Sequence, residues 1–335
     1  MYRLLLLISG TLFFYTICSA QLKKYSFTRP KMGSPFNLVL VTDDPQKAAA
    51  LAEQAYKLVD SFNHIFSDYE NVSELSVLNN SAGSGKAVTV SPALWDIILQ
   101  SRDAFKKSAG AFDITVGPLS RLWRKHRKTQ NFPAEDSVSF YKKKVGFGKI
   151  QIDMKRHTVL LPAARMYLDL GGIAKGYIAQ QVINRLQQLG IGQALADAGG
   201  DIAMSGIPPN SKGWKVGVNI PETTDSMLAQ KFVLHDMAVA TSGDAYQYLE
   251  HKGHKYSHII DPRTGYGVLS QRNVTVIAAN GALADWLATA CSILPVEMAK
   301  KLATRYHAEV LIGTIENGKV VYHASSGFAR YLTKD

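Results

Sequence analysis

Residues 168–176 read LDLGGIAKG, and this segment determines more of the expected architecture than any other part of the chain. The apolar character of residues 167–170 predicts a short buried strand, and a helix is expected from 173 to 189, ending at Gly190. A helix that starts directly after two glycines can present free backbone amides to an anion. Lys175 falls in its first turn, where a cation is unfavourable for the helix dipole, so we expect an anionic ligand beside it. The spacing fits neither a Walker loop nor the dinucleotide-binding fingerprint.

Strands and helices are expected to interleave on both sides of this segment. The expected strands are residues 37–42, 214–220, 237–241, 274–279 and 308–314, and the expected helices are residues 45–65, 92–107 and 282–294. Few of these helices can serve as regular crossovers between parallel strands. This favours an α+β fold, a layered antiparallel or mixed sheet with packed helices, over a doubly wound sheet. No repeat or flexible linker divides the sequence, so we expect a single domain over residues 21–335.

Residues 1–20 have the pattern of a secretory signal peptide. Arg3 precedes an apolar run over residues 4–14, and small residues close the segment at Ala20. We therefore expect cleavage there, export to the periplasm, and at most peripheral contact with a membrane. An uncleaved anchor is the alternative, although the apolar run is short for a membrane span. A lipoprotein is disfavoured, because the residues before Cys18 do not match a lipid-attachment site.

The chain is basic, with a formal net charge of +11. Basic proteins bind nucleic acids, anionic lipids or phosphate-rich ligands, and the expected export argues against nucleic acid. Most of the local charge lies in residues 121–128, which read RLWRKHRK. We interpret this cluster as a solvated basic loop, with attraction of an acidic partner or a dinucleotide as the alternative.

Two polar segments beside glycines are candidate ligand-binding sites. Asp113 lies between apolar neighbours in residues 110–118, where its carboxylate can accept hydrogen bonds from a ring N–H or a ribose hydroxyl; the alternative is a loop cap. His258 precedes a polar turn that ends at Gly265, not far along the chain from residues 241–244, which read TSGD. A histidine in such a turn is a candidate general base, although a lone histidine is usually structural.

The helix expected over residues 282–294 carries an isolated polar pair. Asp285 and Thr289 are four residues apart, so they lie together on one side of the helix, flanked by Ala284 and Ala288. Small neighbours leave room for an ion, and a few hard oxygen ligands suit Mg²⁺, which keeps waters and also binds substrate phosphates. A packed polar pair without a ligand is the alternative.

Taken together, these segments resemble the FAD:protein FMN transferase family, also called ApbE. The resemblance runs from Met32 to the helix of Asp285, which is most of the chain. Its ordered motifs are FSDY (66–69) with SELSVLN (73–79), AFD (111–113), DLGGIAKGY (169–177), DAGGDI (197–202), ATSGD (240–244), HIIDPRTG (258–265) and ADWLATA (284–290).

The resemblance implies a single ApbE-like, T-fold-related catalytic domain and a specific set of site residues. The implied flavin-binding residues are Met32, Tyr69, Ala111, Phe112, Asp113, Asp169, Lys175 and Ile259. The implied Mg²⁺ ligands are the carbonyl of Gly172 and the side chains of Asp285 and Thr289. His258 matches the histidine that the family uses for proton transfer, and it forms the implied catalytic pair with Asp285.

The reaction implied by the resemblance moves FMN from FAD onto a protein. Mg²⁺ neutralises charge on the FAD diphosphate, a threonine or serine hydroxyl of an exported acceptor attacks the FMN phosphorus, and AMP leaves. Family acceptors are electron-transport or ion-pumping subunits with FMN-binding domains. Two alternatives stay open: an Mg²⁺-dependent FAD pyrophosphatase that yields FMN and AMP, and a periplasmic FAD-binding protein without turnover.

Overall fold

The structure is a computed structural model that describes residues 21–332 except 222–226, 244–247, 270–271 and 317–318. The signal-peptide prediction falls on residues 1–20, and Asp244 of the TSGD segment falls in one of the gaps, so both lie outside the described residues. Among the described residues, none of the helices combines the length and apolar character that a membrane span requires.

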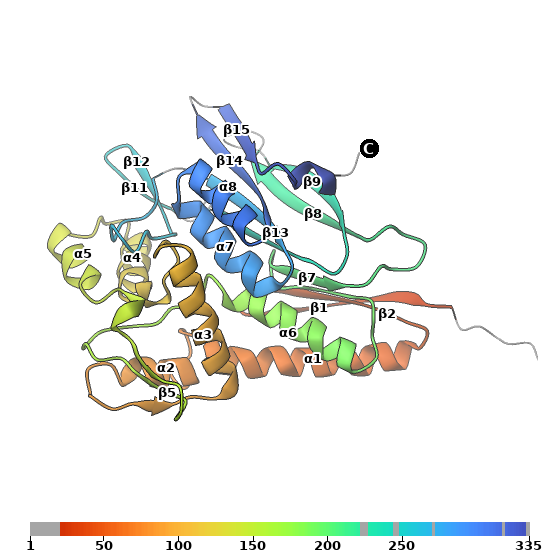
Figure 1. The fold of residues 1–335 in the computed structure, drawn as a ribbon, viewed down its shortest axis with the longest axis horizontal. Helices are drawn as coiled ribbons and strands as arrows, with labels where there is room; N and C mark the ends of the chain where they lie inside the picture. Colours follow the sequence, from red (N-terminus) through yellow and green to blue (C-terminus); the bar gives the residue numbers. More distant parts are fainter. Residues whose placement is uncertain (1–20, 222–226, 244–247, 270–271, 317–318, 333–335) are drawn as a thin grey trace, which may run out of the picture.

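An eight-stranded sheet, in which every neighbouring pair of strands is antiparallel, forms the centre of the molecule (Figure 1). In spatial order its strands are β1 (Lys23–Lys31), β2 (Ser34–Thr42), β6 (Ala194–Asp197), β7 (Ile202–Ser205), β10 (Ala238–Gly243), β13 (Arg272–Ala278), β14 (Glu309–Glu316) and β15 (Lys319–Ala324). The expected α+β architecture is confirmed, because a doubly wound fold would need a mainly parallel sheet.

Both faces of this sheet are covered, because side chains along a strand alternate between its two sides. Along β2, Leu38 and Leu40 join the main core under the helices, whereas Val41 joins a second core on the opposite face. The helices of the first face are α1 (Pro45–Phe66), α6 (Ala174–Gln188), α7 (Gly281–Ile293) and α8 (Val296–Arg305), packed in that order (Figure 1). The second face is covered by the hairpin β8 (Trp214–Pro221) and β9 (Met227–Leu234), with Phe232 against Phe328.

Most of the smaller elements lie at one end of the sheet (Figure 1). Between α1 and α6 the chain forms α2 (Glu74–Asn80), α3 (Pro92–Lys107), a short 3₁₀ turn (Ile114–Val116), α4 (Gly117–Thr129), α5 (Glu135–Lys142) and a 3₁₀ turn (Phe147–Lys149), with a small sheet of β3 (Val88–Thr89), β5 (Thr158–Leu160) and β4 (Gln151–Asp153). The hairpin β11 (Tyr248–His251) and β12 (His254–Ser257) follows β10, and a last 3₁₀ turn (Phe328–Tyr331) follows β15.

The expected elements are confirmed to within a few residues, with one exception. α3 has the predicted bounds, and it starts as expected from Pro92 at its first position and Ser91, which caps Leu94 N–H. The predicted strand over residues 167–170 is wrong. Its backbone is extended, but its partner is a side chain: Asn79 donates to Leu168 O at 3.0 Å and accepts from Leu168 N–H at 2.7 Å. An asparagine amide can replace a neighbouring strand in this way, and no periodicity reveals it.

The interpretation of residues 121–128 as a solvated loop is also wrong. They belong to α4, whose last turn carries His126, Arg127 and Lys128, where cations favour a helix. Trp123 is fully buried on the inner face, and its indole N–H donates to the Gly265 carbonyl at 2.9 Å. The basic run is therefore one side of an amphipathic helix.

Candidate active site

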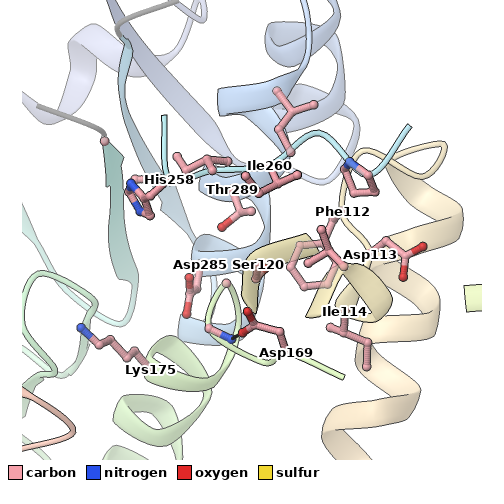
Figure 2. Close-up of a pocket in the computed structure, with 18 of the residues that line it drawn as sticks. Phe112, Asp113, Ile114, Ser120, Asp169, Lys175, His258, Ile260, Asp285 and Thr289 are labelled. Carbon is pink, nitrogen blue, oxygen red and sulfur yellow. Dashed lines mark hydrogen bonds between the residues drawn. The ribbon is translucent and has the colours of Figure 1, made fainter. Parts of the chain in front are cut away.

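A cavity of about 350 Å³ lies where the start of α6, the middle of α7, the loop before α4 and the hairpin after β12 converge (Figure 2). Eleven of the twelve residues singled out from the sequence line it, and they come from five separate segments of the chain. They are Tyr69, Ala111, Phe112, Asp113, Asp169, Gly172, Lys175, His258, Ile259, Asp285 and Thr289, with Met32 the one further candidate outside the lining.

The glycine seam, which we define as Gly172, Gly176, Gly281, Asp285 and Thr289, forms one side of the cavity. A Cβ atom on Gly176 would lie 2.2 Å from the Gly281 carbonyl oxygen and 2.7 Å from Asp285 Cβ, so α6 and α7 touch backbone to backbone. A Cβ atom on Gly172 would lie 2.8 Å from Thr289 Oγ1. Only glycine fits at these positions, and the three residues implied as metal ligands are therefore neighbours.

Asp285 is held at the start of α6 although it belongs to α7. Its Oδ2 accepts from Gly176 N–H at 3.0 Å, while Ile173, which precedes α6, provides no side-chain cap. A carboxylate at a helix N-terminus is stabilised by the free amides and the helix dipole. This contact explains how a carboxyl group that is only 6% exposed can be kept in the core.

The charge around Asp285 favours a bound cation. Burial raises the pKa of Asp285 to about 7, against the lowering effects of Gly176 N–H and Lys175. Burial also raises the pKa of Asp201 well above its ordinary value, and Asp285 raises it further. Asp201 lines the cavity but was not singled out from the sequence, where it stands only as one letter of the DAGGDI motif. One buried and one half-buried carboxyl group with one nearby lysine leave a deficit of positive charge.

The oxygen atoms at the seam suit Mg²⁺ better than they suit a metal ion that needs a full set of side-chain ligands. Within the part of the chain that the structure describes, no three His, Cys, Asp or Glu side chains gather as a metal centre. The seam offers a carboxylate from Asp285, a hydroxyl from Thr289 and the backbone of Gly172, which are hard oxygen donors in small number. Mg²⁺ accepts such incomplete sets because it keeps waters and binds substrate phosphates.

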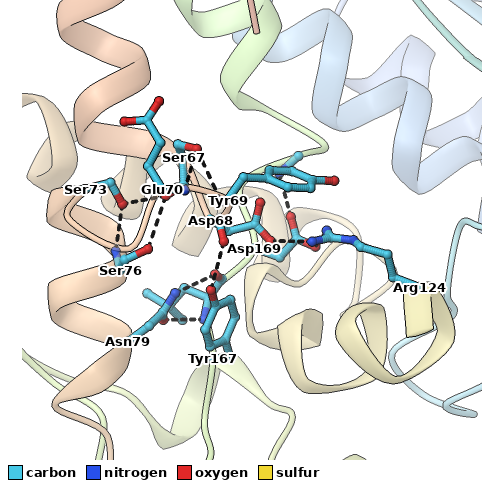
Figure 3. A network of polar contacts seen from close by, with 12 residues as sticks. Ser67, Asp68, Tyr69, Glu70, Ser73, Ser76, Asn79, Arg124, Tyr167 and Asp169 are labelled. Carbon is cyan, nitrogen blue, oxygen red and sulfur yellow. Dashed lines mark hydrogen bonds and ion pairs between the residues drawn. The ribbon is translucent and has the colours of Figure 1, made fainter. Parts of the chain in front are cut away.

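Tyr69, Arg124 and Asp169 line another side of the cavity, and Asp68 pairs with Arg124; we define these four residues as the ionic wall (Figure 3). Arg124 donates to Asp68 Oδ2 at 3.0 Å, and its other terminal nitrogen lies 3.8 Å from Asp169 Oδ2. Its guanidinium carbon also lies 4.4 Å from the centre of the Tyr69 ring. Sequence reasoning missed Arg124, because it appeared there only as one charge in a basic cluster.

Asp113 has its carboxylate already occupied by the backbone. Oδ1 accepts from Thr115 N–H at 2.8 Å and from Thr115 Oγ1 at 2.6 Å, and Oδ2 accepts from Phe147 N–H at 3.1 Å. Burial raises the pKa of Asp113, and these hydrogen bonds oppose the rise. The loop-cap alternative therefore describes the contacts of Asp113, while the residue also lines the cavity beside Phe112.

His258 lies on a hairpin that α4 anchors from behind. Ser257 N–H donates to Val268 O at 2.9 Å, and the carbonyl of Gly265 accepts from buried Trp123. Asp261 pairs with Arg263 at 2.8 Å within the turn, so these two charges stabilise the hairpin. His258 and Thr289 both line the cavity (Figure 2).

Met32 is the sequence candidate that the structure leaves out of the cavity lining. It is half-buried in the turn between β1 and β2, with a positive φ of 51°. The same turn places Ser34 against Gly199, where an added Cβ would lie 2.4 Å from Ser34 Oγ. Because Gly199 does line the cavity, Met32 is near the site without reaching it in this structure.

Comparison with known proteins identifies the family of this chain. Residues 32–312 match the model of the ApbE family. The FAD:protein FMN transferase of Haemophilus influenzae is 28% identical over 92% of this chain and 92% of its own length, and one from Klebsiella pneumoniae is 30% identical over 82% and 83%. The solved flavin transferase ApbE from Vibrio cholerae superimposes with a TM-score of 0.82 at 26% identity, covering 93% of this chain and all (100%) of that one. The apo form of the Pseudomonas stutzeri flavinyl transferase ApbE gives 0.83 at 26% identity, covering 94% and 98%. This chain therefore belongs to the ApbE family.

Proposed function

We propose that this chain transfers FMN from FAD onto a threonine or serine hydroxyl of an acceptor protein, depends on Mg²⁺ and releases AMP. The observation that carries the proposal is the glycine seam: it seats Asp285 on the first turn of α6, beside Lys175 and Thr289, in one cavity with His258. The names of the similar proteins support flavin transfer as the reaction.

The start of α6 is the part of the site suited to the FAD diphosphate. The Lys175 ammonium group and the positive end of the α6 dipole both attract an anion, while Gly176 N–H is already taken by Asp285. Lys175 Nζ lies 3.6 Å from the position that a Cβ on Gly199 would take, so the loop after β6 borders the same space. A glycine there lets a phosphate approach the backbone closely.

Asp285, Thr289 and the Gly172 carbonyl would hold the Mg²⁺. When bound, the ion supplies positive charge against the diphosphate, where negative charge builds up during phosphoryl transfer. Asp285 remains ionised more readily beside such a charge, which offsets the cost of its burial.

His258 is the group placed to accept the proton of the incoming hydroxyl. The acceptor oxygen forms a bond to the phosphorus on the FMN side, and the bond from that phosphorus to the bridging oxygen breaks. AMP leaves with the bridging oxygen, and the proton passes to the imidazole of His258. The product is a phosphodiester between FMN and the acceptor. The hairpin anchored by Trp123 keeps the histidine at the cavity during this step.

The remaining lining residues are suited to the flavin. Tyr69 offers an aromatic ring, and Phe112 and Ile259 offer apolar contacts beside Asp113 and Asp169. We also propose that the enzyme acts after export, on acceptors with FMN-binding domains in electron-transport or ion-pumping complexes. This part rests on the signal-peptide pattern of residues 1–20 and on the family resemblance.

Co-expression with an exported protein that has an FMN-binding domain tests the proposal. Intact mass should show the acceptor gaining one FMN, and His258→Asn should reduce the rate by roughly 100-fold or more, as loss of a general base does. FAD binding should persist in that variant, because the flavin contacts are unchanged. Rapid AMP release from FAD in the absence of an acceptor, together with no mass gain when an acceptor is supplied, would instead identify a pyrophosphatase.

A further inference from the structure

Arg124 occupies an unusual position between two acidic side chains and an exposed aromatic ring (Figure 3). It comes from α4, whereas Asp68 and Tyr69 follow α1 and Asp169 precedes α6, so one side chain joins three segments. The Asp68 and Asp169 side chains are 9% and 15% exposed, and Arg124 is 27% exposed. Ion pairs this far from bulk water contribute more than those on an open surface.

Asp68 and Asp169 depend on Arg124 for charge balance. Burial raises the pKa of Asp68, Asp169 raises it further, and Arg124 acts in the opposite direction. Burial works against the charge of Arg124, but Asp68 and Asp169 together raise its pKa. Arg127, about one turn further along α4, makes no ion pair with either carboxylate among the described residues. Removal of Arg124 would therefore leave two nearby carboxylates without their counter-charge.

The same guanidinium group contacts one side of Tyr69. The tyrosine is 75% exposed, which is high for an aromatic residue that lines a cavity. A cation held against a ring restricts where that ring can lie. Arg124 itself is fixed by its neighbour, because buried Trp123 ties the same turn of α4 to the Gly265 carbonyl.

We propose that Arg124 is a positioning residue for the flavin: it holds Asp169 and the Tyr69 ring in the orientation in which they bind FAD. The inference rests on the proposed function, in which Asp169 and Tyr69 contact the flavin. Arg124 lines the cavity, and its contacts are with Asp68, Tyr69 and Asp169, so its effect falls on FAD binding and not on the transfer step. If the ion pairs of Arg124 were purely structural, its substitution would lower the stability of the fold as well as the affinity for FAD.

Four variants test this inference: Arg124→Met, Arg124→Lys, Lys125→Met and the double variant Arg124→Met/Asp68→Asn. Arg124→Met should raise the KM and Kd for FAD on the order of 10- to 30-fold, the loss expected for a charge-assisted hydrogen bond, with kcat changed less than about 3-fold. Arg124→Lys keeps the charge and should recover part of this loss. Lys125→Met, which removes an exposed charge from the same helix, should match the wild type.

The double variant separates positioning from charge balance. Asp68→Asn relieves the uncompensated charge but restores neither the Arg124 contact with Asp169 nor the one with Tyr69, so FAD affinity should stay within about 3-fold of that of Arg124→Met. Recovery of the wild-type affinity would show that Arg124 only balances charge and would overturn the inference. Thermal unfolding of all four proteins shows whether each variant is folded. Values of Kd and KM in Arg124→Met equal to those of the wild type would overturn the inference, and so would an equal loss of kcat in Arg124→Met and Arg124→Lys. Either result would leave flavin transfer by the wild type standing. If the wild type transfers no flavin, the proposed function fails, and the FAD-binding titrations still decide the role of Arg124.

Discussion

The glycine seam and the ionic wall enclose the same cavity but are held together by different forces. At the seam, α6 and α7 approach so closely that an added Cβ on Gly176 would lie 2.2 Å from Gly281 O. At the wall, Arg124 reaches Asp68 and Asp169 from another helix through a long flexible side chain. Steric contact at the seam fixes the position of reacting groups, and charge at the wall orients groups that bind. Changes at the seam should therefore affect stability and turnover together, whereas changes at the wall should affect affinity.

The largest effect is expected from Asp285→Asn. The amide keeps an oxygen that can accept from Gly176 N–H, so the fold should persist, but the carboxylate proposed to hold Mg²⁺ is lost. Flavin transfer should fall on the order of 1,000-fold, or about 4 kcal/mol of transition-state stabilisation. Acceptor mass and AMP release measure this change. A variant that kept more than a tenth of the activity would contradict a metal role for the seam.

The second prediction concerns pH and stability without divalent cations. The pKa of Asp285 is raised from about 4 in an unfolded chain to about 7 in the fold, so the folded state binds the proton more tightly. Its stabilising contribution is complete below pH 4 or so and is lost as the pH rises toward about 7, a loss of up to about 4 kcal/mol. Denaturant unfolding in a chelator should show this decline between those values, and Asp285→Asn should flatten it. A flat wild-type profile would show that Asp285 is not protonated in the fold.

A third effect, on folding itself, is expected from Gly176→Val. The new side chain would meet Gly281 O and Asp285 Cβ, and separating α6 from α7 should cost about 3 kcal/mol. Gly192→Ala is the matched control, because a Cβ there meets nothing within 4 Å. Denaturant melts of both proteins compare them directly. Equal stability of the two variants would show that the seam can relax.

The smallest effect is expected at the wall, from Tyr69→Leu. The ring is 75% exposed, so its loss should leave stability unchanged while FAD affinity falls about 5-fold, or about 1 kcal/mol for one aromatic contact. Val72→Ala, at a residue that is 71% exposed nearby in the chain, serves as the control. Fluorescence titration with FAD measures both. If Tyr69→Leu changed the melting temperature but not the FAD affinity, the wall would contribute to stability and not to binding, contrary to this comparison.

Some of the site could be predicted because its residues depend on close neighbours in the chain. Gly171 and Gly172 before a helical pattern indicated a helix start, and α6 begins at Ala174. Asp285 and Thr289 are one turn apart, so helical geometry alone places them on one side of α7. The resemblance to a family added the flavin residues, and all of these except Met32 line the cavity.

Other features could not be predicted, because they depend on partners far away in the chain. Asn79 pairs with Leu168 across 89 positions and replaces the predicted strand partner. The basic run at residues 121–128 lies within α4, the helix that positions Arg124, but charge alone did not distinguish a helix from a loop. Asp201 gave no sign of its burial beside Asp285, since a carboxylate in a glycine-rich segment is as common in a turn as in a site.

The sequence by itself determined helices α1, α3, α6 and α7, most of the expected strands, and which short motifs bring polar groups to their ends, because these properties depend on residues within a few positions of one another. Only the tertiary structure decided that a carboxylate of α7 caps α6 and that Arg124 balances Asp68 and Asp169. These contacts join segments tens to more than a hundred positions apart, and packing of the whole core selects them.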